Sequence, residues 1–147
     1  MTARERFTQT RKAVIELNQI KLSIMYQGED WKPDNIRVPG VSDPTANAAI
    51  HNVDEWESKL PILRKREEEL EAFIGLSLVI IKAVKNGLGR EYAEILEQRY
   101  IDCLPWRDVE IDGEKVKKST GKMRVSVAFD WIDSIGITRL MRGDYEV

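Results

Sequence analysis

The chain has little of what catalysis and metal binding usually need. Its 147 residues include one cysteine, Cys103, and one histidine, His51, far from it in the sequence. A single cysteine excludes an internal disulfide and indicates a reducing compartment. Two such ligands are too few for a zinc site, and we expect Cys103 to be a buried, inert side chain. We therefore expect no enzyme activity, no cofactor and no metal.

Long hydrophobic runs and a strong net charge are also missing. The longest apolar runs, such as "LVII" at 78–81, are far too short to cross a bilayer, and "MTARERFTQTRKAV" has no signal-peptide core. These absences predict a soluble, cytoplasmic protein with no membrane partner. Because the formal net charge is only −2, any site for a polyanion has to be a local patch.

Helical periodicity is the main pattern present, and it predicts an all-α fold. A helix is expected over 3–26, where apolar residues recur at spacings of three, four and seven. Residues 28–44 hold three prolines and two glycines without a period, and they predict a loop. The apolar residues of the first helix are Phe7, Val14, Leu17, Ile20, Ile24 and Met25.

A second, long helix is predicted from residue 44 to about 86. Ser42 or Asp43 suits its N-cap and Pro44 its first turn. Apolar residues seven apart predict a coiled-coil seam, used either as a core helix of a bundle or to pair two copies. Pro61 predicts a kink or a break near 57–60, hence one helix or two. The seam consists of Val53, Leu60, Ile74, Ile81 and Leu88 with Trp56, Leu63, Leu70 and Val84.

The C-terminal third has the element order of a helix-turn-helix. After a glycine-containing break we expect a helix over 91–102, a short helix over 105–111 and a connector over 112–118. The last helix is expected from about Thr120 to Ile135, with Ser119 as its cap and Gly136 at its end; a short extension and a frayed tail follow. Such a helix enters the DNA major groove by its first turns.

Two sets of apolar residues are expected to pack together in this region. The stripe on the last helix is Met123, Val127, Trp131 and Ile135, and it is expected to face Leu96, Tyr100, Trp106 and Val109.

The start of the last helix is basic. "STGK" at 119–122 resembles part of a phosphate-binding loop, but the glycine spacing is wrong and Met123 stands where that loop needs a hydroxyl. Basic side chains would neutralise DNA phosphates, and Thr120, Lys122, Arg124 and Ser126 would read base edges. A solvated connector before an ordinary packing helix is the alternative. The candidate DNA-binding residues are Lys115, Lys117, Lys118, Ser119, Thr120, Lys122, Arg124 and Ser126.

Several of these segments together resemble a known family. "VSDPTANAA" (41–49), the heptad-rich helix, "ILEQRYIDCLPWRDV" (95–109) and the Ser-Thr start of the last helix are similar to phage ArpU- and RinA-like transcription regulators. The resemblance runs from about 41 to 135. It implies a sequence-specific activator of phage late genes in the bacterial host, which binds promoter DNA and acts with host RNA polymerase. It also implies a helix-turn-helix similar to sigma factor region 4.

The resemblance assigns roles to single residues. Tyr100, Trp106 and Val109 match the family's core positions, and Ser119 and Thr120 match the start of its recognition helix. The outward face of that helix is matched by Lys122, Arg124 and Ser126.

The chain departs from the family in its connector. Glu110 and the charged "IDGEKVKK" exceed the usual short link, and they predict either a wing-like hairpin or a longer turn. We thus expect an oligomerisation region over 1–88, with a dimer favoured, and a DNA-binding helix-turn-helix over 89–147. The alternatives are a helical phage assembly, packaging or adaptor protein that binds nucleic acid non-specifically, and a regulator that binds only another protein, such as RNA polymerase.

Overall fold

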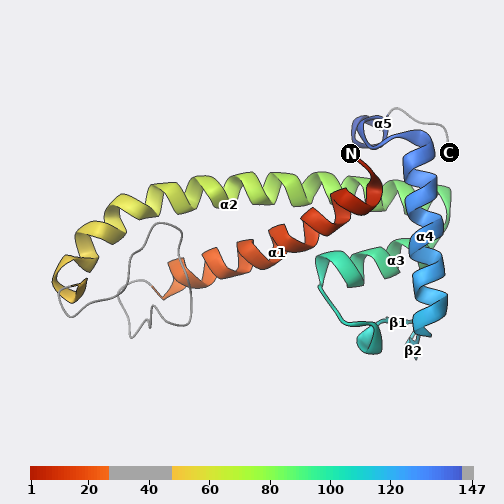
Figure 1. Cartoon of the computed structure of the whole chain (residues 1–147), viewed down its shortest axis with the longest axis horizontal. Helices are drawn as coiled ribbons and strands as arrows, with labels where there is room; N and C mark the ends of the chain where they lie inside the picture. Colours follow the sequence, from red (N-terminus) through yellow and green to blue (C-terminus); the bar gives the residue numbers. More distant parts are fainter. Residues whose placement is uncertain (27–47, 144–147) are drawn as a thin grey trace. The chain divides into compact units, whose positions relative to one another are not determined.

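A computed structural model describes residues 1–26 and 48–143, with side chains from residue 57 onwards in the second range. The described residues are mostly helical, which confirms the expected all-α class (Figure 1). The expected loop over 28–44 and the helix start at Ser42–Pro44 lie outside them. The helices are α1 (Ala3–Met25), α2 (Ala48–Gly87), α3 (Arg90–Leu96), α4 (Lys118–Ile135) and α5 (Ile137–Arg142).

The chain forms two compact units. Residues 1–14 and 72–147 make up the first unit, and residues 15–71 make up the second. Both α1 and α2 therefore contribute to each unit. The boundary expected between residues 88 and 89 falls inside the first unit, because the start of α1 and the end of α2 pack with the C-terminal helices.

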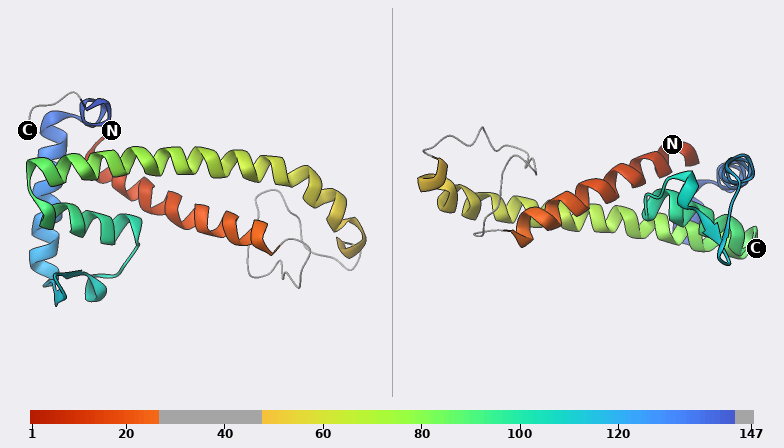
Figure 2. Two further views of the ribbon diagram at one scale, coloured as in Figure 1. Left: turned by 180° about the vertical axis from the view of Figure 1, so that it is seen from behind. Right: turned by 90° about the horizontal axis from the view of Figure 1, so that it is seen from below.

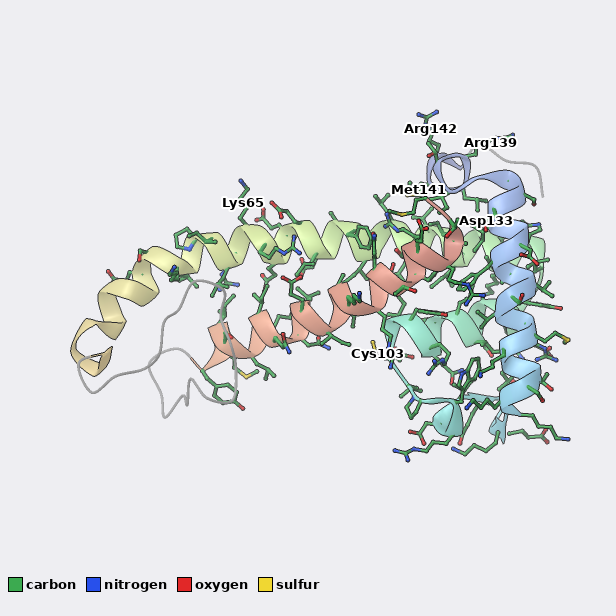
Figure 3. The ribbon with its side chains drawn as sticks, viewed as in Figure 1. Lys65, Cys103, Asp133, Arg139, Met141 and Arg142 are labelled. Atoms are coloured by element: carbon green, nitrogen blue, oxygen red, sulfur yellow. The ribbon has the colours of Figure 1, made fainter. Side chains whose placement is uncertain are left out.

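The start of α1 is capped by a reciprocal pair of local hydrogen bonds and by one bond to α4. Thr2 Oγ1 accepts a hydrogen bond from the Glu5 N–H at 3.2 Å, and Glu5 Oε2 accepts one from the Thr2 N–H at 3.3 Å. This reciprocal pair is a capping box, which satisfies amides that have no partner inside the helix. Asp133 of α4 accepts a further bond from the Ala3 N–H at 2.7 Å, and Figure 3 shows it beside this helix end. The first residues of the chain are thereby tied to α4.

The buried face of α1 is more polar than its sequence stripe predicts. Phe7, Leu17 and Ile20 are buried as expected, but Met25 is 62% exposed. In the first unit Arg6 and Thr10 are buried instead. Arg6 Nε donates to Ser77 Oγ of α2 at 3.1 Å, and Thr10 Oγ1 lies 2.7 Å from the same oxygen. Ser77 occupies a gap in the seam, so hydrogen bonding replaces apolar packing there.

The α2 helix is unbroken through Pro61, so the alternative of two helices is wrong. A proline frees the carbonyl four residues earlier, here that of Glu57. Both residues are exposed, and water can therefore satisfy that carbonyl. The ribbon curves in its yellow N-terminal part rather than breaking (Figure 1).

Most of the predicted seam of α2 is buried where its side chains are described, although Leu60 and Leu88 are only half-buried. α1 of the same chain covers it in each unit: through the Ser77 bonds in the first, and in the second through ion pairs from Arg66 to Glu16 at 2.9 Å and from Lys21 to Glu71 at 3.4 Å. The heptad spacing thus serves packing within one chain, and a dimer remains a prediction. The buried seam residues are Leu63, Leu70, Ile74, Ser77, Ile81 and Val84.

The segment between α3 and α4 differs from the expected short helix. The helix of α3 continues as a π-helical turn, η1 (Glu97–Ile101), and only η2 (Trp106–Asp108) is helical in the predicted range. The backbone becomes extended at Val109 and forms an antiparallel hairpin of β1 (Glu110–Ile111) and β2 (Glu114–Lys115). The wing-like alternative is therefore confirmed, while the helix-turn-helix remains a prediction.

The hairpin has a turn that its sequence specifies. Asp112 and Gly113 both have positive φ, at 54° and 81°. A two-residue turn of this hand matches the twist of the two strands, and Asp-Gly is among its preferred sequences.

The α4 helix crosses α3 and the end of α2 (Figure 1 and the left view of Figure 2). Its buried face is not the predicted stripe, because Met123 is 57% and Val127 is 40% exposed. Residues four apart advance by about 40° per step around a helix, so such a stripe winds away from the core. Trp131 and Ile135 are half-buried on the core. The buried residues are Gly121, Val125, Ala128, Phe129 and Ile132.

The core of the first unit joins α1 to the C-terminal helices. The aromatic rings of Phe7, Tyr100 and Phe129 pack together, and their centroids lie 5.5–5.8 Å apart. Leu96 and Val109 are fully buried, as expected. Gly136 ends α4 as predicted, and the short extension expected after it is helical. This extension is α5, and its Leu140 is fully buried.

Within the described ranges, no helix combines the length and apolar character needed to cross a membrane.

Candidate nucleic-acid interface

The start of α4 lies earlier than expected and has no side-chain capping hydrogen bond. Lys117 is the N-cap with extended backbone, and no side chain accepts a bond from the first turn. The expected cap, Ser119, is the second helical residue, because the chain leaves β2 extended and enters the helix directly at Lys118. No acidic residue lies in the first turn. Lys117 and Lys118 thus stand at the positive end of the helix dipole, where cations are disfavoured.

One group of predicted site residues shares an exposed face of α4. Ser119, Lys122 and Ser126 are exposed at spacings of three and four, with Lys118 exposed at the helix start. Met123 and Val127 are exposed beside them at the same spacing, although the sequence stripe placed them in the core. This face, Ser119, Lys122, Met123, Ser126 and Val127, is called the outer face of α4 below.

The remaining predicted residues lie on a different side, against the hairpin. Lys115, Lys117, Thr120 and Arg124 line a shallow hollow together with acidic side chains from α3 and the hairpin. Ion pairs compensate two of the cations: Arg124 lies 3.0 Å from Glu91, and Lys115 lies 2.9 Å from Glu110. The structure therefore divides the predicted patch into an outer face and a hollow in which Lys115 and Arg124 are paired with acidic side chains and Lys117, within the described ranges, is not. The acidic lining residues of the hollow are Glu91, Asp112 and Glu114.

The hairpin is held firmly beside α4. Gln98 binds both backbone groups of Glu110: its Nε2 donates to the carbonyl at 2.7 Å, and its Oε1 accepts from the N–H at 3.0 Å. Arg90 donates to both carboxylate oxygens of Asp112 at 2.8 and 2.7 Å. At the other end, the Val116 N–H donates to the Val109 carbonyl at 3.1 Å. The wing is therefore a fixed part of this surface.

Trp106 ties the first turns of α4 to the segment before the hairpin. Its ring lies directly against Gly121, so closely that a Cβ there would overlap it. The same Trp106 ring also forms a cation–π contact, because the Arg99 guanidinium carbon lies 4.5 Å from the ring centroid. The sequence placed Trp106 in the core, but only the structure shows that it needs a glycine opposite it.

Cys103 is half-buried rather than buried as expected. Its backbone has a positive φ of 56°, and its Sγ lies within 4.0 Å of the Arg11 carbonyl of α1 (Figure 3). Among the residues that the structure describes, no group of three or more histidine, cysteine, aspartate or glutamate side chains is arranged to hold a metal ion.

No protein-family model, no curated protein and no solved structure matches the chain. The assignment of function therefore depends on the geometry of the site.

Proposed function

We propose that the chain is a sequence-specific, DNA-binding transcription regulator that contacts double-stranded DNA through the start of α4 and the adjoining hairpin. The observation that carries this proposal is the lysine-rich, uncapped start of α4. Within the described part of the chain, Lys117, Lys118 and Lys122 have no ion-pair partner, unlike Lys115 and Arg124.

The electrostatics of this helix start favour a bound anion. Free backbone amides and lysine ammonium groups lie together at the positive end of the helix dipole. Without an anion this arrangement is unfavourable, whereas a phosphate would accept bonds from the amides and balance the lysine charges. Because the net charge of the chain is −2, such attraction has to come from a local group of cations such as this one.

The outer face of α4 is suited to approach base edges. Ser119 and Ser126 are short and can donate or accept hydrogen bonds. Lys122 can donate to guanine, and the apolar Met123 and Val127 can contact thymine methyl groups. These residues differ from those expected from sequence to read base edges, because Thr120 and Arg124 line the hollow instead. The hairpin would lie along the adjacent backbone and contribute phosphate contacts.

The resemblance in the sequence supports a narrower context for this activity. Regulators of that family activate phage late genes at promoters, and on that basis we propose that the chain acts at a late promoter with host RNA polymerase. A two-fold repeated operator would indicate that it binds as a dimer.

The test is a gel-shift comparison between a promoter fragment of the chain's own genome and random DNA of equal length. The triple variant Lys117→Ala, Lys118→Ala, Lys122→Ala should bind both fragments much more weakly, and the dependence of log affinity on log salt should fall by about one per lost phosphate contact. The matched control removes three exposed lysines of α2, Lys65, Lys82 and Lys85, and should bind like the parent protein.

Two results contradict the proposal. Equal affinity for both DNA fragments at every salt concentration would indicate the non-specific assembly or adaptor alternative. If the parent protein shows no DNA binding, the regulator acts through another protein. The exposed apolar pair Met123 and Val127 gives that second candidate its specific support, because apolar side chains on a helix surface also suit a protein partner.

A further inference from the structure

Two arginines from distant parts of the chain lie near Tyr100. Arg11 comes from α1 and Arg99 from the π-helical turn η1, and both belong to the first unit. The carbonyl of Arg11 lies 4.0 Å from Cys103 Sγ, which places the end of η1 against this part of α1. Single-turn π-helices occur often at functional sites.

These arginines are only partly satisfied. Among the described residues, neither forms an ion pair with a carboxylate. The Nε atoms of Arg11 and Arg99 are buried and have no hydrogen-bond partner. Arg99 is held in place, because its Nη1 donates to the Leu104 carbonyl at 2.7 Å and its guanidinium packs on Trp106. Because neither guanidinium group has a carboxylate of the described residues within ion-pair distance, their positive charge is left unbalanced.

The electrostatic effects at Tyr100 are consistent with such a concentration of charge. Burial lowers the pKa of the Arg99 guanidinium, and the nearby charge of Arg11 lowers it further. Burial raises the pKa of the Tyr100 hydroxyl, while the charges of Arg99, Arg4 and Arg11 act in the opposite direction. Arg4 is exposed and lies with its guanidinium carbon 5.5 Å from the Phe129 ring. Three cations therefore influence one phenol.

We propose that Arg11 and Arg99, with the Tyr100 hydroxyl and with Arg4 at the rim, form a binding site for a phosphate group. Planar guanidinium forks match the oxygens of phosphate and can bind it through two bonds at once. Several uncompensated cations favour a dianion or a polyanion over a single carboxylate. The phosphate belongs either to a small phosphorylated molecule or to a nucleic-acid backbone. This site contains none of the lysines of α4, and its proposal does not depend on the proposed function.

The primary experiment measures thermal unfolding in inorganic phosphate and in chloride at equal ionic strength. Phosphate stabilises most folded proteins by exclusion from their surface, so the decisive quantity is the difference between variants. Arg11→Gln and Arg99→Gln should lose most of the phosphate-dependent rise in Tm, which we expect to be about 3 °C or more for the parent protein. The control is Arg142→Gln, an exposed arginine of α5 (Figure 3), which should respond like the parent. An equal rise in all four proteins overturns the proposal.

A second readout does not depend on stability. Bound phosphate offsets the arginine charges that lower the pKa of Tyr100, so it should raise that pKa further. Ultraviolet titration of the parent protein should show this shift, and the Tyr100→Phe variant should lack it. If a glutamine variant does not fold, Arg11→Lys and Arg99→Lys keep the charge without the planar fork. Phosphate should then bind at least about tenfold more weakly. No shift of Tyr100 in the parent, or undiminished binding by the lysine variants, overturns the proposal.

A DNA-binding measurement on the same variants identifies the source of the phosphate. If Arg11→Gln and Arg99→Gln also reduce the salt dependence of duplex binding, the site holds a backbone phosphate. If duplex binding is unchanged while the phosphate response is lost, the ligand is a small phosphorylated molecule. The phosphate titration contains no DNA, so failure of the DNA-binding proposal and failure of this one are distinguishable.

Discussion

At the scale of single residues, two glycines set how closely helices approach tryptophan rings. Gly121 at the start of α4 faces Trp106, and Gly87 at the end of α2 faces Trp131. In both cases a Cβ would overlap the ring. Neither glycine has a positive φ, so close approach explains them and backbone freedom does not.

We predict opposite effects for two glycine-to-alanine changes within helices. Gly121→Ala should lower the free energy of unfolding by about 1–3 kcal/mol, because the added methyl group displaces Trp106. Gly75→Ala in α2 should raise it by about 0.5–1 kcal/mol, because alanine favours the helix and meets no atom within 4 Å. Urea unfolding measures both changes. If both substitutions were stabilising, the ring contact would not constrain α4.

At the scale of elements, the uncapped, lysine-rich start of α4 is unfavourable for the helix but suits the proposed DNA contact. Lys117→Asp should raise the free energy of unfolding by about 1 kcal/mol, because aspartate caps the free amides and suits the helix dipole. The same change should weaken DNA binding, since it replaces a cation by an anion. Chemical unfolding and gel shifts on one preparation provide the comparison. Tighter DNA binding by the variant would argue against α4 as the contacting helix.

The hairpin provides a second test at this scale. Gly113→Val should cost about 1–3 kcal/mol of stability, because a β-branched residue is strained at φ 81°. Glu114→Val places the same side chain one residue later, in extended β2, and should cost little. Both are measured by urea unfolding. Loss of DNA binding with Gly113→Val alone would support a role for the wing, whereas equal stability of the two variants would mean that the turn imposes no strain.

At the scale of the whole molecule, the heptad seam stabilises one chain. Leu70→Ala should lower the free energy of unfolding by about 2–5 kcal/mol, because Leu70 is only 4% exposed. Ile62→Ala, on the same helix and 62% exposed, should change it by less than about 0.5 kcal/mol. Since α1 already covers the seam, sedimentation should give the folded Leu70→Ala variant the same association state as the parent. Dissociation caused by Leu70→Ala at unchanged stability would show that the seam pairs two copies.

Local signals in the sequence determined much of this architecture. Apolar spacing predicted α1 and the buried α2 residues Leu63, Leu70, Ile81 and Val84, and Gly136 marked the end of α4. These predictions succeed because periodicity and helix termination depend on nearby residues. The hairpin turn is likewise a local feature, because Asp112 and Gly113 both tolerate the positive φ that it requires. The charged connector was also compatible with a longer turn.

Tertiary structure alone decided which faces are buried and which charges remain free. Four-residue spacing on α4 suggested Met123 and Val127 as core residues, but contacts with α1, α3 and Trp106 bury the face of Val125 and Phe129 instead. The basic patch was divided by Glu91 and Glu110, whose pairing with Arg124 and Lys115 depends on how α3 and the hairpin lie. Arg11 and Arg99 are 88 positions apart, and no local pattern brings them together. Helical period is a short-range property of the chain, whereas burial and charge pairing depend on which distant segment covers each face.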